Sequence, residues 1–258
     1  MIPLGQKSAY IETYTPELLF PIARKSTLDL FGFDLWHGYE LSWLNPQGKP
    51  EVCVAEFIFP CNSPNLIESK SFKLYLNSFN QTKIESIDAL YELLKKDLSA
   101  ACGAKVQVQL KKLNEVNNAS FKILSGICLD DQEITCDTYH VNPDYLKCES
   151  NHVSQTVYSH LLKSNCPVTN QPDWATIVID YSGKQINHAG LLRYIVSFRD
   201  HQDFHEQCVE RIFADIWQLC APEKLTVAAY YTRRGGLDIN PVRSSSEIPV
   251  YSLRLWRQ

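Results

Sequence analysis

The strongest constraint on the fold is the order of the expected elements, which is the same in both halves of the 258-residue chain. In each half, two strand-like segments are followed by two segments with apolar side chains at helical spacing and then by further strand-like segments. The expected strands are 33–43, 51–60, 105–110, 121–128, 153–162, 175–181, 225–232 and the final segment up to 257. The expected helices are 69–79, 84–101, 189–198 and 205–220. This order predicts an α+β protein made of two tandem ββααββ units.

The two units are expected to meet at a polar stretch, 130–151. We place residues 1–145 in an N-terminal module and residues 146–258 in a C-terminal one. A hydrophobic fraction of 45%, with thirteen tyrosines and five tryptophans, is enough to build a core in a chain of this length.

Charge and cysteine usage exclude several classes of protein. A net charge of −4 gives no general attraction to nucleic acid, so direct binding of nucleic acid is not expected. The nine cysteines are odd in number and never spaced Cys-x-x-Cys, which is typical of free thiols in a reducing cytosol. Residues 1–7 have no apolar targeting core, and no segment approaches the roughly 20 apolar residues of a membrane span. We therefore expect a cytoplasmic protein without membrane contact.

The segment with the clearest chemical content is Ser-Asn-Cys-Pro-Val-Thr-Asn-Gln-Pro-Asp at 164–173. Pro167 and Pro172 restrict the backbone and favour a preset loop over a helix or a central strand. Cys166 and Asp173 on this loop offer a thiol nucleophile and a carboxyl group for proton transfer. A free thiol has a pKa near ~8.5, so nucleophilic attack requires a neighbouring base or positive field. The alternative is that Cys166 packs as a small apolar side chain and Asp173 caps a turn.

A second motif, Glu-Ser-Lys-Ser at 68–71, lies at the start of the first expected helix. Its structural interpretation is that Ser69 caps the helix while Glu68 is solvated. Lys70 and Lys73 are, in that case, ordinary surface charges.

His205 and Glu206 begin the last expected helix, with Asp203 at a possible N-cap position. Asp203 followed three residues later by Glu206 is a capping-box pattern. His201 and His205 are four residues apart, but no third ligand stands at a suitable spacing, so no metal is expected.

A third motif, Arg233-Arg234-Gly235-Gly236, has two interpretations. The glycines suit a hairpin turn that needs positive φ. Alternatively, the arginine forks bind phosphate and glycine permits close approach of the backbone. The chain has no Gly-x-Gly-x-x-Gly, so a Rossmann site is excluded and any dinucleotide must be held by loops and sheet edges.

Taken together, these motifs resemble the NADPH-dependent nitrile reductases, the 7-cyano-7-deazaguanine reductases of queuosine biosynthesis, in their long two-module form. The likeness runs from about Leu41 to the C-terminus, and its most specific part is Glu-Ser-Lys-Ser-x-Lys at 68–73. It implies the tunnelling fold (T-fold), in which ββααββ units with antiparallel sheets join into a barrel with helices outside. It also implies a homodimer, because two chains supply four such units.

The resemblance assigns a role to each motif. Cys166 adds to the nitrile carbon to form a thioimide, and Asp173 transfers the proton. The residues implied in binding the small-molecule substrate, 7-cyano-7-deazaguanine, are Ile67, Glu68, Ser69, His205 and Glu206. Those implied in binding NADPH are Ser69, Lys70, Arg234 and Gly235. The carboxylates suit the adjacent N–H donors of a guanine-like ring edge.

Two other functions compete with this assignment. One is a zinc-dependent cyclohydrolase on the same fold, in which Cys166 is a metal ligand with a second cysteine or histidine nearby. The other is a non-catalytic purine-binding module in which the cysteine is incidental.

Overall fold

The computed structural model describes residues 11–25, 30–114 and 121–258. Residues 1–7, which we expected to lack a targeting core, lie outside this part. The strands are β1 (Pro21–Ala23), β2 (Phe31–Leu44), β3 (Pro50–Pro60), β4 (Asn65–Ile67), β5 (Gln107–Lys111), β6 (Ile127–Cys128), β7 (Cys148–Asn165), β8 (Pro172–Ile186), β9 (Lys224–Tyr231) and β10 (Leu237–Ser244). The helices are α1 (Ser69–Asn77), α2 (Ile87–Cys102), α3 (His188–Ser197) and α4 (His205–Cys220), with short 3-10 turns at Pro16–Leu18, Pro143–Tyr145 and Phe198–Asp200.

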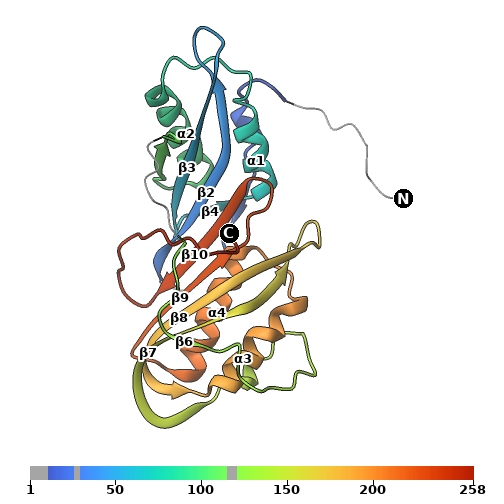
Figure 1. The fold of residues 1–258 in the computed structure, drawn as a ribbon, viewed down its shortest axis with the longest axis vertical. Helices are drawn as coiled ribbons and strands as arrows, with labels where there is room; N and C mark the ends of the chain where they lie inside the picture. The colour runs from blue at the N-terminus through green and yellow to red at the C-terminus, as the bar shows by residue number, and fades with distance from the viewer. Residues whose placement is uncertain (1–10, 26–29, 115–120) are drawn as a thin grey trace, which may run out of the picture.

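One eight-stranded sheet runs through both halves of the molecule, in the order β5-β3-β2-β10-β9-β8-β7-β6 (Figure 1). Its neighbours are antiparallel except for β6 and β7, which are parallel. The halves join where β10 pairs with β2, from Leu237 opposite Gly38 to Ser244 opposite Phe31. The protein is therefore of the α+β class, as predicted.

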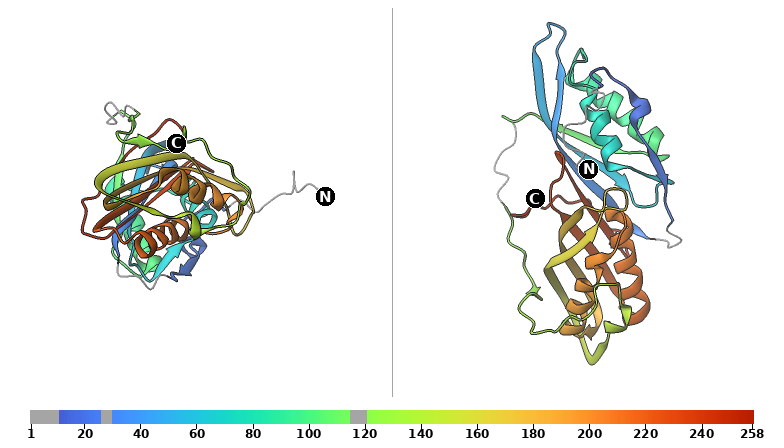
Figure 2. Two further views of the ribbon diagram at one scale, coloured as in Figure 1. Left: turned by 90° about the horizontal axis from the view of Figure 1, so that it is seen from below. Right: turned by 90° about the vertical axis from the view of Figure 1, so that its right-hand side faces the viewer.

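The helices cover one face of the sheet, as the right-hand view of Figure 2 shows. On that face α1 and α2 pack with Trp36 and Phe57 in one core, and α3 and α4 pack with Ile177 and Val227 in a second. The opposite face carries a smaller apolar cluster that includes Tyr230. Strand alternation explains the division, because successive side chains point to opposite faces.

The expected helices and most of the expected strands are confirmed, including one in the final segment, but the pairing expected for residues 121–128 is wrong. Residues 121–128 were expected to pair with 105–110; instead only β6 is a strand, and it pairs with β7. The final segment forms β10 and then continues without regular structure. Leu124 and Leu253 pack against the apolar cluster on the helix-free face, and Lys122 donates a backbone hydrogen bond to Arg254. Contacts across this face thus replace the expected strand pairing.

Among the described residues, the first half therefore has the order ββββααββ and the second half ββααββ. The module boundary after residue 145 stays a prediction. In the described part of the chain, no helix has the length and apolar character needed to cross a membrane.

Candidate active site

The cysteine loop closes the hairpin between β7 and β8. The Cys166 N–H donates to the Gln171 carbonyl, and the Asn170 N–H donates to the Cys166 carbonyl. Asn170 adopts a left-handed backbone with φ of 57°, which asparagine tolerates better than most residues. Because Asn165 pairs with Pro172 across the strands, the loop has a fixed base, as the two prolines predicted.

The Cys166 side chain is 8% exposed and has a lowered pKa. Burial acts to raise this pKa, but hydrogen bonds to the thiolate outweigh the burial. They come from the Thr169 side chain, the backbone of Thr169 and Val168, and Arg234. The loop thus supplies the stabilisation that a reactive thiolate requires.

Asp173 is 5% exposed and lies between two basic groups. Its Oδ1 is 3.0 Å from a terminal nitrogen of Arg234, and its Oδ2 is 3.2 Å from His205 Nε2. The His205 ring stacks on Tyr231 with 3.8 Å between centroids. His205 Nδ1 is buried without a hydrogen-bond partner among the described residues. The stacked Tyr231 ring and the Asp173 carboxylate therefore hold the His205 imidazole in place.

Glu68, not Ser69, is the N-cap of α1, so the structural alternative for Ser69 is wrong. The Glu68 carboxylate accepts hydrogen bonds from the N–H groups of Lys70, at 2.9 Å, and Ser71, at 2.7 Å. A carboxylate at a helix N-terminus satisfies free backbone donors and interacts favourably with the helix dipole. The Ser69 side chain is left to line the pocket.

The expected capping box on α4 is also wrong. Phe204 is the N-cap, and the Asp203 carboxylate accepts a hydrogen bond from the Phe204 N–H. Glu206 is consequently free of a capping role and is 3% exposed. Burial and the neighbouring Asp34 raise its pKa while Arg24 lowers it, and the net result is a pKa of about 8. The Glu206 side chain is therefore largely protonated at neutral pH.

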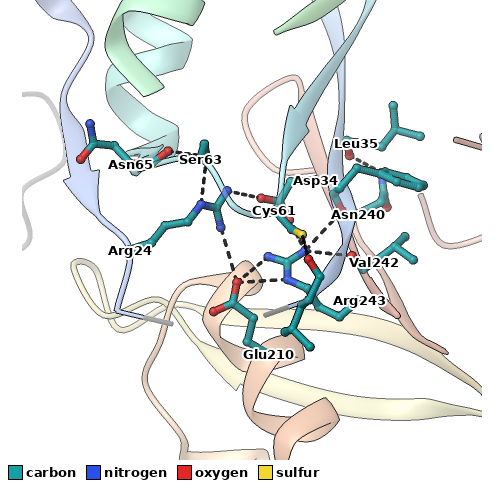
Figure 3. A network of polar contacts seen from close by, with 12 residues as sticks. Arg24, Asp34, Leu35, Cys61, Ser63, Asn65, Glu210, Asn240, Val242 and Arg243 are labelled. Atoms are coloured by element: carbon teal, nitrogen blue, oxygen red, sulfur yellow. Dashed lines mark hydrogen bonds and ion pairs between the residues drawn. The ribbon is translucent and has the colours of Figure 1, made fainter. Parts of the chain in front are cut away.

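A buried ion network lies beside Glu206 and joins the two halves of the chain (Figure 3). Arg243 on β10 is fully buried and lies 2.7 Å from both Asp34 on β2 and Glu210 on α4. Arg24 pairs with the same two carboxylates. Two arginines thus already balance two acids, which explains why a third acid, Glu206, is unfavourable there as an anion.

The turn between β9 and β10 brings Arg234 to the cysteine loop. Arg234 and Leu237 are paired through backbone hydrogen bonds, and the intervening Gly235 and Gly236 have φ of 62° and 78°. The hairpin interpretation is thus correct, and it places the Arg234 guanidinium 2.9 Å from Gln171 Oε1. Arg233 instead stacks on Tyr39, with 3.7 Å from its guanidinium carbon to the ring centroid.

All these parts meet around two adjoining cavities. The larger, of about 320 Å³, and a narrow one, of about 20 Å³, are both lined by Ser69, Cys166, His205 and Arg234. The structure brings together the ten residues predicted from sequence, namely Ile67, Glu68, Ser69, Lys70, Cys166, Asp173, His205, Glu206, Arg234 and Gly235. Walls from both halves of the chain therefore enclose a single site.

Sequence reasoning did not assign several other residues that line these cavities. Trp36, Lys73, Thr169, Gln171 and Phe204 are among them. Thr169 and Gln171 lie inside the cysteine loop, so that motif contained a signal for them. Trp36 gave no signal, because strand alternation alone makes it an ordinary core residue.

Comparison with known proteins identifies the family. Residues 10–110 match the model of "Nitrile reductase, 7-cyano-7-deazaguanine-reductase N-term", and residues 172–249 match that of "QueF-like protein". A relative from Paraburkholderia xenovorans (strain LB400), an NADPH-dependent 7-cyano-7-deazaguanine reductase, is 51% identical over 99% of this chain and 98% of its own length. The apo crystal structure of the archaeosine synthase QueF-Like is 16% identical, with a TM-score of 0.33 over 39% of this chain and 99% of that one, too low to support an argument. On the sequence matches, the chain belongs to the family of NADPH-dependent 7-cyano-7-deazaguanine reductases.

Proposed function

We propose that the pocket reduces the nitrile of 7-cyano-7-deazaguanine to a primary amine, with Cys166 as a covalent nucleophile. The chain is an NADPH-dependent nitrile oxidoreductase of queuosine biosynthesis, as its family membership indicates. The single observation that supports the assignment of roles is the convergence of the ten predicted residues on the cavities around Cys166. Membership of a reductase family also speaks against the zinc hydrolase and the passive purine-binding module.

The covalent step follows from the state of the thiol. The Cys166 sulfur adds to the nitrile carbon while the nitrile nitrogen gains a proton, and the product is a thioimide. Asp173 is the acid that transfers this proton, and Arg234 and His205 hold its carboxyl group in position. Reduction to the amine consumes two hydrides and two protons, and the carbon–sulfur bond breaks between the two hydride additions. Cys166 leaves as a thiolate, which its lowered pKa favours.

Glu68 and Glu206 are the acceptors for the adjacent N–H donors of the substrate ring. Glu68 already accepts one backbone N–H on each oxygen, but each carboxylate oxygen has a second lone pair. Glu206 is protonated in the empty pocket, so accepting two hydrogen bonds from substrate requires it to lose a proton. Ile67 and His205 complete the substrate walls.

The residues around the larger cavity fit NADPH. Lys70, Lys73 and Arg234 supply three cationic groups for phosphates, and Ser69 adds a hydroxyl. A side chain at Gly235 would place its Cβ 3.1 Å from Lys73 Cδ, so glycine keeps this approach to Lys73 open. When bound there, NADPH supplies the hydrides.

The architecture supports the finer fold assignment as well. We assign the T-fold, with modules at 1–145 and 146–258, because the second half has the ββααββ order and the helices share one sheet face. The sheet ends at β5 and β6, which each lack a partner on one side among the described residues. A homodimer that closes a barrel would cover these edges, and light scattering should give twice the chain mass. A cytoplasmic location agrees with nine free thiols.

The covalent step is tested by incubating the protein with the nitrile substrate alone and analysing its peptides by mass spectrometry. We expect one adduct on the peptide that contains Cys166, and loss of both the adduct and NADPH oxidation in Cys166→Ala. Cys136→Ala, which removes a thiol outside the pocket, is the matched control and should keep both. Equal NADPH oxidation by wild type and Cys166→Ala would show that catalysis does not use this thiol.

A further inference from the structure

A cluster of potential metal ligands lies away from the active site, at the edge of the sheet where β6 pairs with β7. One ligand atom from each of Cys128, Asp130 and His160 lies within 4.8 Å of the other two. All three side chains are partly exposed. In the described part of the chain, this is the one group of three potential metal ligands whose atoms lie this close together. Cys166 is not part of it.

Strand geometry explains why these side chains face the same way. β6 runs parallel to β7, with Cys128 opposite Tyr158. Leu129 and Ser159, the intervening residues, are fully buried, and Leu129 packs in the core beneath α3 and α4. Because successive side chains alternate, Cys128 and His160 point to the other face. Asp130 follows the end of β6, at the edge of the sheet, where its carboxylate reaches the buried Ser159 hydroxyl and lies close to both of these side chains.

The active site lies on the helix side of the same strands. In β8, Ala175 and Ile177 point into the helix-covered core, whereas Val178 packs on the helix-free face. The Thr176 side chain, which contacts His160, points to the helix-free face as Val178 does. The cluster is therefore separated from the Cys166 pocket by the sheet.

Hydrogen bonds already orient two of the three ligands. The Thr176 hydroxyl oxygen lies 2.9 Å from His160 Nδ1, which leaves Nε2 for a metal when Nδ1 carries the proton. The Asp130 carboxylate accepts hydrogen bonds from the Ser159 hydroxyl, at 2.6 Å, and from the His160 N–H, at 3.1 Å. Outer partners of this kind fix the orientation of ligands in known metal sites.

We propose that Cys128, Asp130 and His160 bind a divalent transition-metal ion, with Zn²⁺ as the ion that best matches their sulfur, oxygen and nitrogen donors. Metal–ligand bonds of 2.0–2.3 Å place tetrahedral ligands roughly 3.3–3.6 Å apart, so small side-chain rotations from the present spacing are enough. A thiolate and a carboxylate neutralise the two positive charges.

The site has three protein ligands and therefore an open fourth position. His160 also lines a cavity of about 440 Å³, together with Tyr158, Thr176 and Trp256. Water from this cavity can complete the coordination, as in zinc sites with three protein ligands. Bound metal would fasten the end of the first half, at β6, to β7.

The test is a titration of the full chain with Co²⁺, followed by competition with Zn²⁺, after removal of metals with a chelator. A Cys166→Ala background removes the reactive thiol of the other site. We expect one equivalent of Co²⁺ to bind and give a thiolate-to-cobalt charge-transfer band. Cys128→Ser should abolish the band, whereas Cys136→Ser, the matched thiol control, should keep it.

Two further variants separate binding from folding. Thr176→Val removes an outer hydrogen-bond partner of His160 and should weaken Zn²⁺ binding by roughly 10–100-fold. His160→Gln removes a metal ligand itself and should weaken Zn²⁺ binding by more than that. Circular dichroism checks that each variant is folded. Absence of stoichiometric binding, or identical affinities for the Cys128→Ser and Cys136→Ser proteins, would overturn the proposal.

Discussion

Replacing Glu206 with glutamine should make the protein more stable, and the gain should grow with pH. Glutamine has nearly the same shape as glutamic acid and does not titrate. Burial and Asp34 raise the pKa of Glu206 from an ordinary value of 4.5 to about 8. The folded state therefore keeps a proton between these pH values that the unfolded state has lost.

The sign and size of the effect follow from this difference in bound protons. Where the folded state binds more protons, the free energy of unfolding falls as pH rises, by about 1.4 kcal/mol per pH unit. The contribution of Glu206 to the free energy of unfolding is fully present below pH 4.5 and is lost as pH rises to about 8. At pH 7 the wild-type protein has lost about 3 kcal/mol of its free energy of unfolding in this way. The Glu206→Gln variant does not titrate at this position and keeps that free energy.

Urea unfolding of wild type and Glu206→Gln at several values between pH 5 and pH 8, at equal protein concentration, measures the difference. Glu92→Gln is the control, since Glu92 is exposed on α2 and pairs only with Lys95 in the described structure. A Glu206→Gln difference that stays constant across this range would contradict the raised pKa. An increase with pH in the control as well would assign the effect to general charge, not to burial.

Three further outcomes are expected. Arg243→Met leaves two buried carboxylates short of a partner and should lower the free energy of unfolding by about 3–5 kcal/mol, measured in urea. Thr169→Val removes a side-chain hydrogen bond that lowers the pKa of Cys166, so the pH midpoint of its alkylation by iodoacetamide should rise, and an unchanged midpoint would argue against this contact. Substrate binding at pH 7 should release close to one proton from Glu206, seen by calorimetry in buffers of different ionisation enthalpy, and Glu206→Gln should release none.

The sequence predicted most of the elements because their signals are local. The helix 205–220 was predicted with its observed bounds, and the positive φ of Gly235 and Gly236 follows from their place in a hairpin turn. Residues 121–128 were assigned wrongly because their apolar side chains suit a strand and an irregular segment packed on the surface of the sheet equally well. Only long-range packing against the helix-free face decides between the two.

The candidate site was predicted as a set of residues but not as an electrostatic environment. The cysteine loop and the Glu-Ser-Lys-Ser motif are contiguous in sequence, so their members could be named. The raised pKa of Glu206 depends on burial and on Asp34, which lies far away in the chain on β2. The capping errors at Ser69 and Asp203 arose because each N-cap lies one residue away from the expected position. Glu68 caps α1 through its carboxylate, whereas Phe204 provides no side-chain cap for α4.

The pairing of β10 with β2 limits how the enzyme can admit its ligands. Eight residues of each strand are paired, so the halves form one continuous sheet and no hinge separates them. Rotation of one half against the other would break this pairing, whereas the 166–171 loop and the Gly235-Gly236 turn, which lie between strands, can shift without breaking it. Cross-linking the 166–171 loop to the Gly235-Gly236 turn should therefore slow the entry and release of ligand, while the pairing of β10 with β2 stays intact.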